Sequence, residues 1–188
     1  MSARAQESGG AGVLVVFLVF ALVAAGQHAA KPQQARPRTT ATTAPVSMRA
    51  PAGLSFTDGA GCSPAGDWRS ARLDRRVRQL LVAAAAHHRI RVSCLRTGHS
   101  WFVAGTNRVS NHSVWRGVDL DQVDGYPVSP ANQAARELAL WIGRGGAGVQ
   151  PSEVGSPWDP GGGPWFTNQA HQNHIHVGFA GPTQGGGR

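Results

Sequence analysis

The stretch His174-Ile-His-Val-Gly-Phe179 decides the fold that we expect for this chain, because apolar side chains alternate along it with polar or small residues. Alternation with a period of two is typical of a β-strand that buries one face. Ile90–Leu95 and Val118–Val123 alternate in the same way, and the three segments predict the strands of a β-sheet. In the third segment the period places Val118 and Leu120 on one side, and Asp119, Asp121 and Val123 on the other.

Two helices are expected beside these strands. The first lies within residues 67–88, where apolar residues recur at helical spacing and Asp67 or Ser70 is the expected N-terminal cap. Its apolar face consists of Leu73, Val77, Leu80, Leu81 and Ala84. The second begins at Ser129-Pro130, a cap followed by a first-turn proline, and ends at Gly143. The sequence therefore predicts a small α+β domain with an antiparallel sheet and helices packed on one side.

The 188-residue chain is long enough for one domain with appendages. Residues 11–25 form an uncharged, apolar run of about 15 residues, which is the length of the hydrophobic part of a signal peptide. We therefore expect a signal peptide at residues 1–26, with an uncleaved membrane anchor as the alternative. Residues 27–53 are rich in Pro, Thr and Ala and predict a disordered linker. The domain is expected at residues 54–181, followed by a Gly-rich tail at 182–188.

Cysteine content and charge indicate where the chain works and with which partners. Cys62 and Cys94 are its two cysteines, and in an exported protein such a pair predicts a disulfide. We therefore expect an extracytoplasmic protein, either secreted or anchored at the cell envelope. The net charge of +8 favours anionic partners such as acidic lipids or wall polymers. No basic run is interleaved with aromatic residues, so nucleic acid is not an expected partner, and no oligomeric state is predicted.

Histidines gather beside a carboxylate in two parts of the sequence. His112 and Asp119 stand seven residues apart in SNHSVWRGVD, and a turn between them would bring the two side chains together. His174 and His176 lie two residues apart in the expected strand, so both side chains leave the same face. His171 precedes them in an expected turn. One carboxylate with two histidines is a ligand set that suits Zn²⁺ and leaves a fourth position for water.

Two motifs carry a resemblance to a known group of proteins. SNHSVWRGVD, residues 110–119, resembles the SxHxxGxAxD box of zinc D-alanyl-D-alanine carboxypeptidases. HQNHIHVGF, residues 171–179, resembles the HxxHxH strand of murein endopeptidases, and both families belong to the Hedgehog/DD-peptidase fold group. The wider pattern CLRTGHS, GTNRVSNH and GVDLD resembles an actinobacterial branch of that group. The resemblance covers about residues 70–180 and implies a zinc peptidase-like domain.

The resemblance implies a role for each histidine of the two motifs. His112, Asp119 and His176 match the zinc ligands of the group. His174 matches the histidine that lies beside the metal and assists the reaction, and His171 matches the first histidine of HxxHxH.

Other residues are expected to support the metal ligands. The resemblance implies a cation that stabilises the oxyanion, at Arg96 or Arg108. Asp121 shares the expected face of Asp119 and is either a partner of the ligands or a solvated acid. His99 in TGHS is either such a partner or an ordinary turn residue.

The chain departs from the pattern of the group at three positions. Trp115 stands where the box usually has Gly, and it either fills a gap between loop and core or lines the substrate cleft. Gly117 replaces the usual Ala. Asn173 stands where the carboxypeptidases place a Glu as general base, so in this chain a histidine would have to transfer the proton.

Together these features predict a zinc-dependent peptidase that hydrolyses an amide of the stem peptide or cross-bridge of peptidoglycan, as a carboxypeptidase or an endopeptidase. The alternative is a non-catalytic, zinc-containing module that binds the cell wall without cutting it. Stem peptides are the expected partners, and residues 11–25 supply a membrane contact if the leader is retained. The sequence does not decide which bond is cut.

Overall fold

The computed structural model describes residues 49–59 and 61–181. The expected signal peptide or anchor at residues 1–26, most of the expected linker and the Gly-rich tail at 182–188 lie outside the described residues. Within the described ranges, no helix is both long and apolar enough to cross a bilayer.

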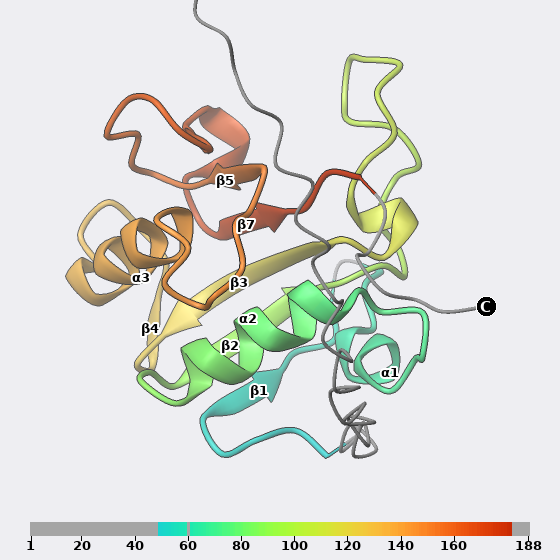
Figure 1. Cartoon of the computed structure of the whole chain (residues 1–188), viewed down its shortest axis with the longest axis horizontal. Coiled ribbons are helices and arrows are strands. Elements are labelled where there is room, and N and C mark those ends of the chain that lie inside the picture. The colour runs from blue at the N-terminus through green and yellow to red at the C-terminus, as the bar shows by residue number, and fades with distance from the viewer. Residues whose placement is uncertain (1–48, 60, 182–188) are drawn as a thin grey trace, which may run out of the picture. The chain divides into compact units, whose positions relative to one another are not determined.

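A seven-stranded sheet with both parallel and antiparallel pairs forms the centre of the domain (Figure 1). Its spatial order is β1-β2-β3-β7-β5-β6, and the short β4 pairs with β3. The strands are β1 (Leu54–Phe56), β2 (Ile90–Cys94), β3 (Gly117–Val123), β4 (Tyr126–Pro127), β5 (Glu153–Gly155), β6 (Trp165–Phe166) and β7 (Ile175–Gly178). β1 runs parallel to β2, and β6 parallel to β5. The prediction of an antiparallel sheet is therefore wrong at both edges. The edge strands β1 and β6 have three and two residues, which are too few to show an alternating pattern in the sequence.

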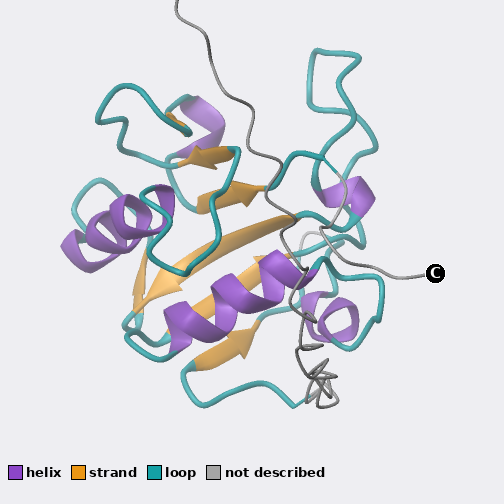
Figure 2. Cartoon of the chain, in the orientation of Figure 1, coloured by secondary structure: helices purple, strands orange, loops and turns teal. Residues whose placement is uncertain are grey.

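The first expected helix is divided in two. The structure has a short α1 (Pro64–Trp68) and a longer α2 (Arg75–Ala85), which crosses in front of the central strands in Figure 2. Neither expected cap is correct, because Asp74 caps α2 by accepting a hydrogen bond from the backbone N–H of Arg76. The apolar face is confirmed, since Leu73, Val77, Leu80, Leu81 and Ala84 are all buried.

The second expected helix begins later than the sequence suggested. α3 (Gln133–Gly143) is capped by Asn132, whose side-chain oxygen accepts a hydrogen bond from the N–H of Ala135. Ser129-Pro130 belongs to the preceding turn, in which the carbonyl of Ser129 accepts a hydrogen bond from the N–H of Asn132. Two short 3-10 turns, η1 (His112–Val114) and η2 (Gln169–His171), complete the described helices.

The core lies on one face of the sheet, where α2 and α3 bury their apolar residues against β3 and β7. β3 does not alternate strictly, because its register with β2 shifts between Arg91 and Val92. Asp121 is the additional residue of the resulting bulge, and beyond it Val123 turns onto the buried face. The expected position of Val123 on the side of the carboxylates is therefore wrong.

The expected disulfide between Cys62 and Cys94 is present, with the two Cα atoms 5.4 Å apart. It joins the segment that follows β1 to the end of β2. Cys94 is consequently fixed at the position where β2 meets β3, on the face of the sheet opposite the core. Upstream, the folded part also includes the end of the expected linker, where Ala50 packs against the core.

Candidate metal centre

A row of directly opposite residues crosses four strands on the face of the sheet away from the core. Cys94 of β2 pairs with Asp119 of β3, Asp119 pairs with His176 of β7, and His176 pairs with Gly155 of β5. Directly opposite residues have Cβ atoms about 5 Å apart, so side chains along such a row touch one another. The long loops of residues 95–111 and 156–174 flank this row (Figure 1).

His112 reaches the row from the η1 turn and is fully buried. Its Nδ1 donates a hydrogen bond to the backbone carbonyl of Leu95, so that in the neutral ring Nε2 carries the lone pair and faces the sheet. Gly117 makes this approach possible, because a Cβ atom at that position would lie 2.7 Å from the imidazole of His112. The chain thus has Gly here for a steric reason.

Three candidate ligand atoms from His112, Asp119 and His176 form a small triangle. Nε2 of His112 lies 3.0 Å from Nδ1 of His176 and 3.2 Å from Oδ1 of Asp119. Nδ1 of His176 lies 2.9 Å from the same Oδ1. The turn that the sequence suggested between His112 and Asp119 therefore exists, and the structure brings the three expected ligands together.

A carboxylate outside both motifs completes this arrangement. Oε1 of Glu153, the first residue of β5, lies 3.1 Å from Nε2 of His176 and accepts a hydrogen bond of 2.6 Å from the side-chain amide of Asn111. Its other oxygen is 2.9 Å from the guanidinium of Arg108. The sequence analysis missed Glu153, because β5 has only three residues and its pairing with His176 depends on distant strands.

When both imidazoles are neutral, their outer hydrogen bonds leave three lone pairs facing one point. The Nε2–H of neutral His176 donates to Glu153, so that its Nδ1 faces Asp119 with a lone pair. His112 presents Nε2, and Asp119 presents a carboxylate oxygen. Lone pairs at such distances repel unless a cation or a proton lies between them. The three atoms of the triangle therefore favour a positive charge between them.

Charges in the site shift the pKa values of its members strongly. Burial alone would raise the pKa of Asp119, but the charges of and hydrogen bonds from His112 and His176 hold it well below its usual value. Burial alone would lower the pKa of His176, but its hydrogen bonds to Asp119 and Glu153 raise it to about 9. Burial also opposes ionisation of Glu153, whose hydrogen bonds from His176 and Asn111 nevertheless lower its pKa to about 2. Without a metal, the triangle therefore holds a proton.

A metal ion is the other cation that this group could hold. Cys94, His112 and Asp119 each offer one ligand atom, and these atoms lie within 4.8 Å of one another. The sulfur of Cys94 is bonded to Cys62 and does not supply a thiolate. Nδ1 of His176 lies 3.0 Å from Nε2 of His112 and 2.9 Å from Oδ1 of Asp119, so it is placed to complete a set of three candidate ligand atoms.

Three further histidines surround the triangle. His99 stacks on His112 with ring centroids 4.0 Å apart, and burial and the charge of His112 lower its pKa. Nε2 of His174 lies 3.8 Å from Oδ1 of Asp119, and burial lowers the pKa of His174. His171 packs edge-on against Phe166, and burial and the charge of His174 lower its pKa to about 4.

The other expected site residues lie at different distances from the centre. Arg108 is close, because it pairs with Glu153. Asp121 lies on the same face as Asp119 but is bound by the guanidinium of Arg91 through two hydrogen bonds of 2.8 and 2.7 Å. Arg96 lines a different cavity, which is described below.

Asn173 and Trp115 depart from the motifs that the sequence resembles, and the structure shows where each residue lies. Asn173 is exposed, and its side-chain oxygen lies 2.9 Å from Nδ1 of His174. Trp115 has φ 65°, in the left-handed region that favours Gly. The indole of Trp115 is half-buried and packs against the core.

Two cavities of about 480 and 460 Å³ lie beside the triangle; Asp119 lines both, and His176 lines the second. Both are lined by His99, Ser100 and Asp119. The first extends towards the Cys62–Cys94 disulfide, and the second extends between the two long loops to His171. Each has the volume of a small-ligand site, so an extended ligand that fills both would pass beside Asp119.

Comparison of the chain with protein-family models, with curated proteins and with solved structures gave no match. The assignment of the fold and of the candidate site therefore rests on the geometry of this chain alone.

Proposed function

We propose that this chain is a zinc-dependent peptidase of the Hedgehog/DD-peptidase group that hydrolyses an amide in the peptide part of peptidoglycan. One observation carries the proposal: atoms of His112, Asp119 and His176 lie 2.9 to 3.2 Å from one another beneath two joined cavities. These are the residues that match the zinc ligands of the group.

The chemistry of the ligand atoms favours zinc. Two imidazole nitrogens and one carboxylate oxygen form a common catalytic zinc set, with bond lengths of about 2.0–2.1 Å. Two ligand atoms of a regular tetrahedron with such bonds lie about 3.3 Å apart. The observed distances of 2.9 to 3.2 Å are close to this value, so small side-chain movements would admit the ion. Bound zinc supplies a Lewis acid and makes a water nucleophilic at neutral pH.

The histidine ligands are held in one orientation by their outer nitrogens. His112 is fixed by the carbonyl of Leu95, and His176 is fixed by Glu153, which is itself held by Asn111. Such partners set the tautomer of each imidazole and restrict its rotation. The site would therefore bind a cation with little reorganisation.

His174 is the residue that we assign to proton transfer. It precedes β7, faces the same side as His176, and its Nε2 lies 3.8 Å from Asp119. The ring lines the cavity beside the triangle, while its Nδ1 contacts Asn173. An imidazole in this place is within reach of a substrate amide and can return the proton to the leaving nitrogen. Arg108 lines the same cavity and is the nearer of the two arginines that we considered for the oxyanion.

The substrate class follows from the resemblance together with the shape of the site. Two cavities on either side of the triangle suit an extended peptide with the scissile amide in the middle. A disulfide is consistent with work outside the cytoplasm, where the stem peptides are located. The net charge of +8 favours an anionic polymer.

A non-catalytic, zinc-containing module that binds the wall is the second candidate. The observation that favours it is the environment of the carboxylates near the triangle. Glu153 is occupied by three partners, and the position of the family's general base is Asn173. If His174 does not replace that base, the site would bind a wall peptide without cutting it.

Turnover of muropeptides by the purified chain separates the two candidates. We expect wild type with zinc to release new amines, and a chelator to abolish this release. His174→Ala should retain zinc while its rate falls about 10²–10⁴-fold, the usual contribution of a positioned acid–base group. His176→Ala should lose both zinc and activity, whereas His87→Ala, remote from the site, should retain both. Full zinc occupancy without any cleavage by wild type would favour the binding module.

A further inference from the structure

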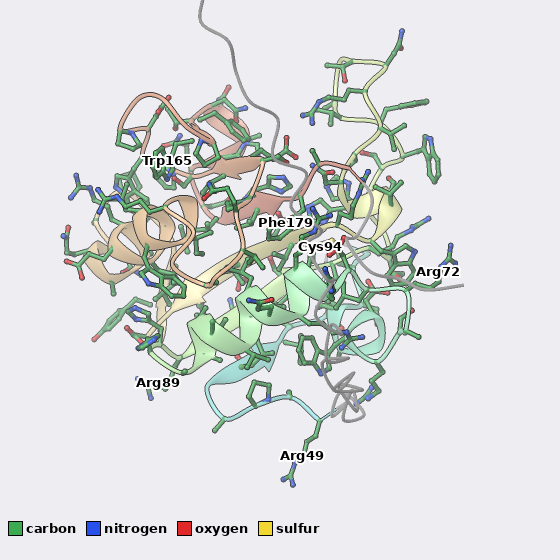
Figure 3. All side chains as sticks on the ribbon, in the orientation of Figure 1. Arg49, Arg72, Arg89, Cys94, Trp165 and Phe179 are labelled. Atoms are coloured by element: carbon green, nitrogen blue, oxygen red, sulfur yellow. A yellow bond between two sulfur atoms is a disulfide. The ribbon has the colours of Figure 1, made fainter. Side chains whose placement is uncertain are left out.

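A separate cavity lies on the other side of the η1 turn from the candidate metal centre. It has a volume of about 390 Å³, and no residue of the triangle lines it. Ser113 and Trp115, which follow His112, line this cavity together with Arg72, Arg96, Thr97 and Trp101. Figure 3 labels Arg72, which lies at the right of the molecule in that view.

The cavity contains two guanidinium groups that no acidic side chain of the described residues neutralises. In that part of the chain, the arginines paired with carboxylates are Arg76, Arg91 and Arg108. Arg72 lies over the ring of Trp115, with its guanidinium carbon 5.2 Å from the ring centroid, and Arg96 uses only its backbone N–H in a hydrogen bond. Two such cations at one cavity attract an anion, and a guanidinium binds a carboxylate through two parallel hydrogen bonds.

The carboxylate of Asp67 does not line the cavity, and residues 96 and 97 use it as a hydrogen-bond acceptor. Its oxygens accept hydrogen bonds from the backbone N–H groups of Arg96 and Thr97 and from the hydroxyl of Thr97. These three bonds fix the segment that carries Arg96. They also use the hydroxyl proton of Thr97, so that only the lone pairs of this oxygen remain for a ligand.

Ser113, like Thr97, uses its hydroxyl proton in hydrogen bonds within the protein. Its single hydroxyl proton is shared between the backbone carbonyls of Ser100 and Trp101, whose oxygens lie 2.8 and 3.0 Å from Oγ. The hydroxyl oxygens of Ser113 and Thr97 can therefore only accept further hydrogen bonds. A ligand that fits must supply hydroxyl or amide donors to these oxygens as well as an anionic group to the arginines.

Two indole rings supply the remaining surface. The side chain of Trp101 is 53% exposed, and Trp115 is held in the left-handed backbone conformation, which is strained for a residue with a Cβ atom. Strain of this kind persists where the surrounding structure enforces it, often at binding sites. Flat aromatic faces pack well against the C–H face of a pyranose ring.

We propose that this cavity binds a carboxylate-bearing sugar. The carboxylate would lie between Arg72 and Arg96, the ring would pack on Trp101 or Trp115, and ring hydroxyls would donate to Ser113. A nucleotide also combines an anion with a flat ring, and the titration below includes one so that the two ligands are distinguished. This second site goes beyond the proposed peptidase function, because it uses no residue of the candidate metal centre.

Titration of the full chain with N-acetylmuramic acid, followed by heat and by tryptophan fluorescence, tests the proposal. N-acetylglucosamine has a similar ring without the carboxylate, lactate has the carboxylate without the ring, and a nucleoside monophosphate tests the other anion. We expect saturable binding of N-acetylmuramic acid at least about ten-fold tighter than that of the other three. Binding should persist in chelator, which separates this site from the candidate metal centre.

Variants locate the binding. Arg96→Gln and Trp101→Leu should each weaken the binding of N-acetylmuramic acid about ten-fold or more, while Arg136→Gln, an exposed arginine of α3, should leave it unchanged. Circular dichroism verifies that each variant is folded, and Arg72→Gln provides a second test if Arg96→Gln is not. Equal binding of the neutral sugar, tighter binding of the nucleotide, or full binding by folded variants of both arginines would overturn the proposal. Failure to cleave muropeptides would leave it unaffected.

Discussion

Strands β3 and β7 have two faces of opposite character, although one alternating pattern builds both. The buried face carries Val118, Leu120, Ile175 and Val177, each fully excluded from solvent. The other face carries Asp119 and His176, whose polar atoms are in contact with His112 and Glu153. The apolar face needs only burial, whereas the polar face needs a partner for each atom from a distant segment.

This difference determines how each face should respond to substitution. Removing a core side chain loses buried area and leaves a cavity. Removing a member of the polar face leaves its former partners buried with an uncompensated charge or lone pair. The core should therefore govern the free energy of unfolding, and the polar face should govern the binding of a cation.

The largest effect on stability is expected at the buried face of β7. Ile175→Ala should lower the free energy of unfolding by about 2–5 kcal/mol, because the side chain is fully buried. Urea unfolding of the metal-free chain measures this loss. Val82→Ala on α2, where the side chain is 49% exposed, should change stability by no more than about 0.5 kcal/mol. Equal losses in the two variants would contradict the assignment of the core.

The disulfide beside the polar face should contribute a similar amount to stability. Replacing both Cys62 and Cys94 by Ala opens a loop with a sequence separation of 32 residues. The chain-entropy argument gives a loss of about 3–4 kcal/mol in the free energy of unfolding. Urea unfolding of oxidised wild type and of the double variant measures it, and alkylation before and after reduction verifies the bond. Two freely alkylated thiols in exported wild type would refute the pairing.

Glu153 provides a sharper test of the polar face, because it touches a proposed ligand without being one. Glu153→Gln should weaken zinc binding about 10–100-fold, since His176 loses the charge that orients it. Competition with a chromophoric chelator measures the affinity. Glu137→Gln on the exposed side of α3 is the matched control and should bind zinc as wild type does. Equal zinc affinity in Glu153→Gln and wild type would remove Glu153 from the site.

The smallest effect on stability is expected at the hydrogen-bonded pair of His88 and Asp124, which belongs to neither face. The hydrogen bond from His88 is the main cause that lowers the pKa of Asp124, which lies in the turn after β3. A lowered pKa in the folded state stabilises the chain above the ordinary value of about 3.9, and this contribution disappears as the pH falls through the lowered value. Because Asp124 is 37% exposed, the contribution is at most about 0.5 kcal/mol.

Asp124→Asn isolates this charge, since Asn keeps the shape and tolerates the left-handed φ of 54°. Wild type should exceed the variant in the urea midpoint at pH 5, and the difference should shrink at pH 3. A difference that grows as the pH falls would show that the sign of the pKa shift is wrong.

The contrast between the buried face and the polar face of β3 and β7 also explains which features could be predicted from the sequence. The apolar faces of α2, β2 and β7 were predicted, because burial leaves a periodic pattern in a single segment. The disulfide was predicted from the presence of two cysteines in an expected exported protein. The candidate ligands His112, Asp119 and His176 were expected from two motifs, and the structure brings their side chains together.

Features that depend on contacts between distant segments were not predicted. Glu153 gains its role from the pairing of β5 with β7, and β5 has too few residues to show a pattern. Asp74 and Asn132 cap the helices instead of the expected residues, because several polar residues in each turn compete for that place. The bulge that turns Val123 into the core depends on the register with β2.

The measurement that tests the central claim most directly is the zinc content of the purified chain. Elemental analysis of wild type should find close to one zinc per chain, bound by His112, Asp119 and His176. His112→Ala should lose the metal to a chelator, because two ligands rarely hold zinc in competition, whereas His87→Ala should retain it. Absence of zinc from correctly folded wild type, or full occupancy in His112→Ala, would contradict the account.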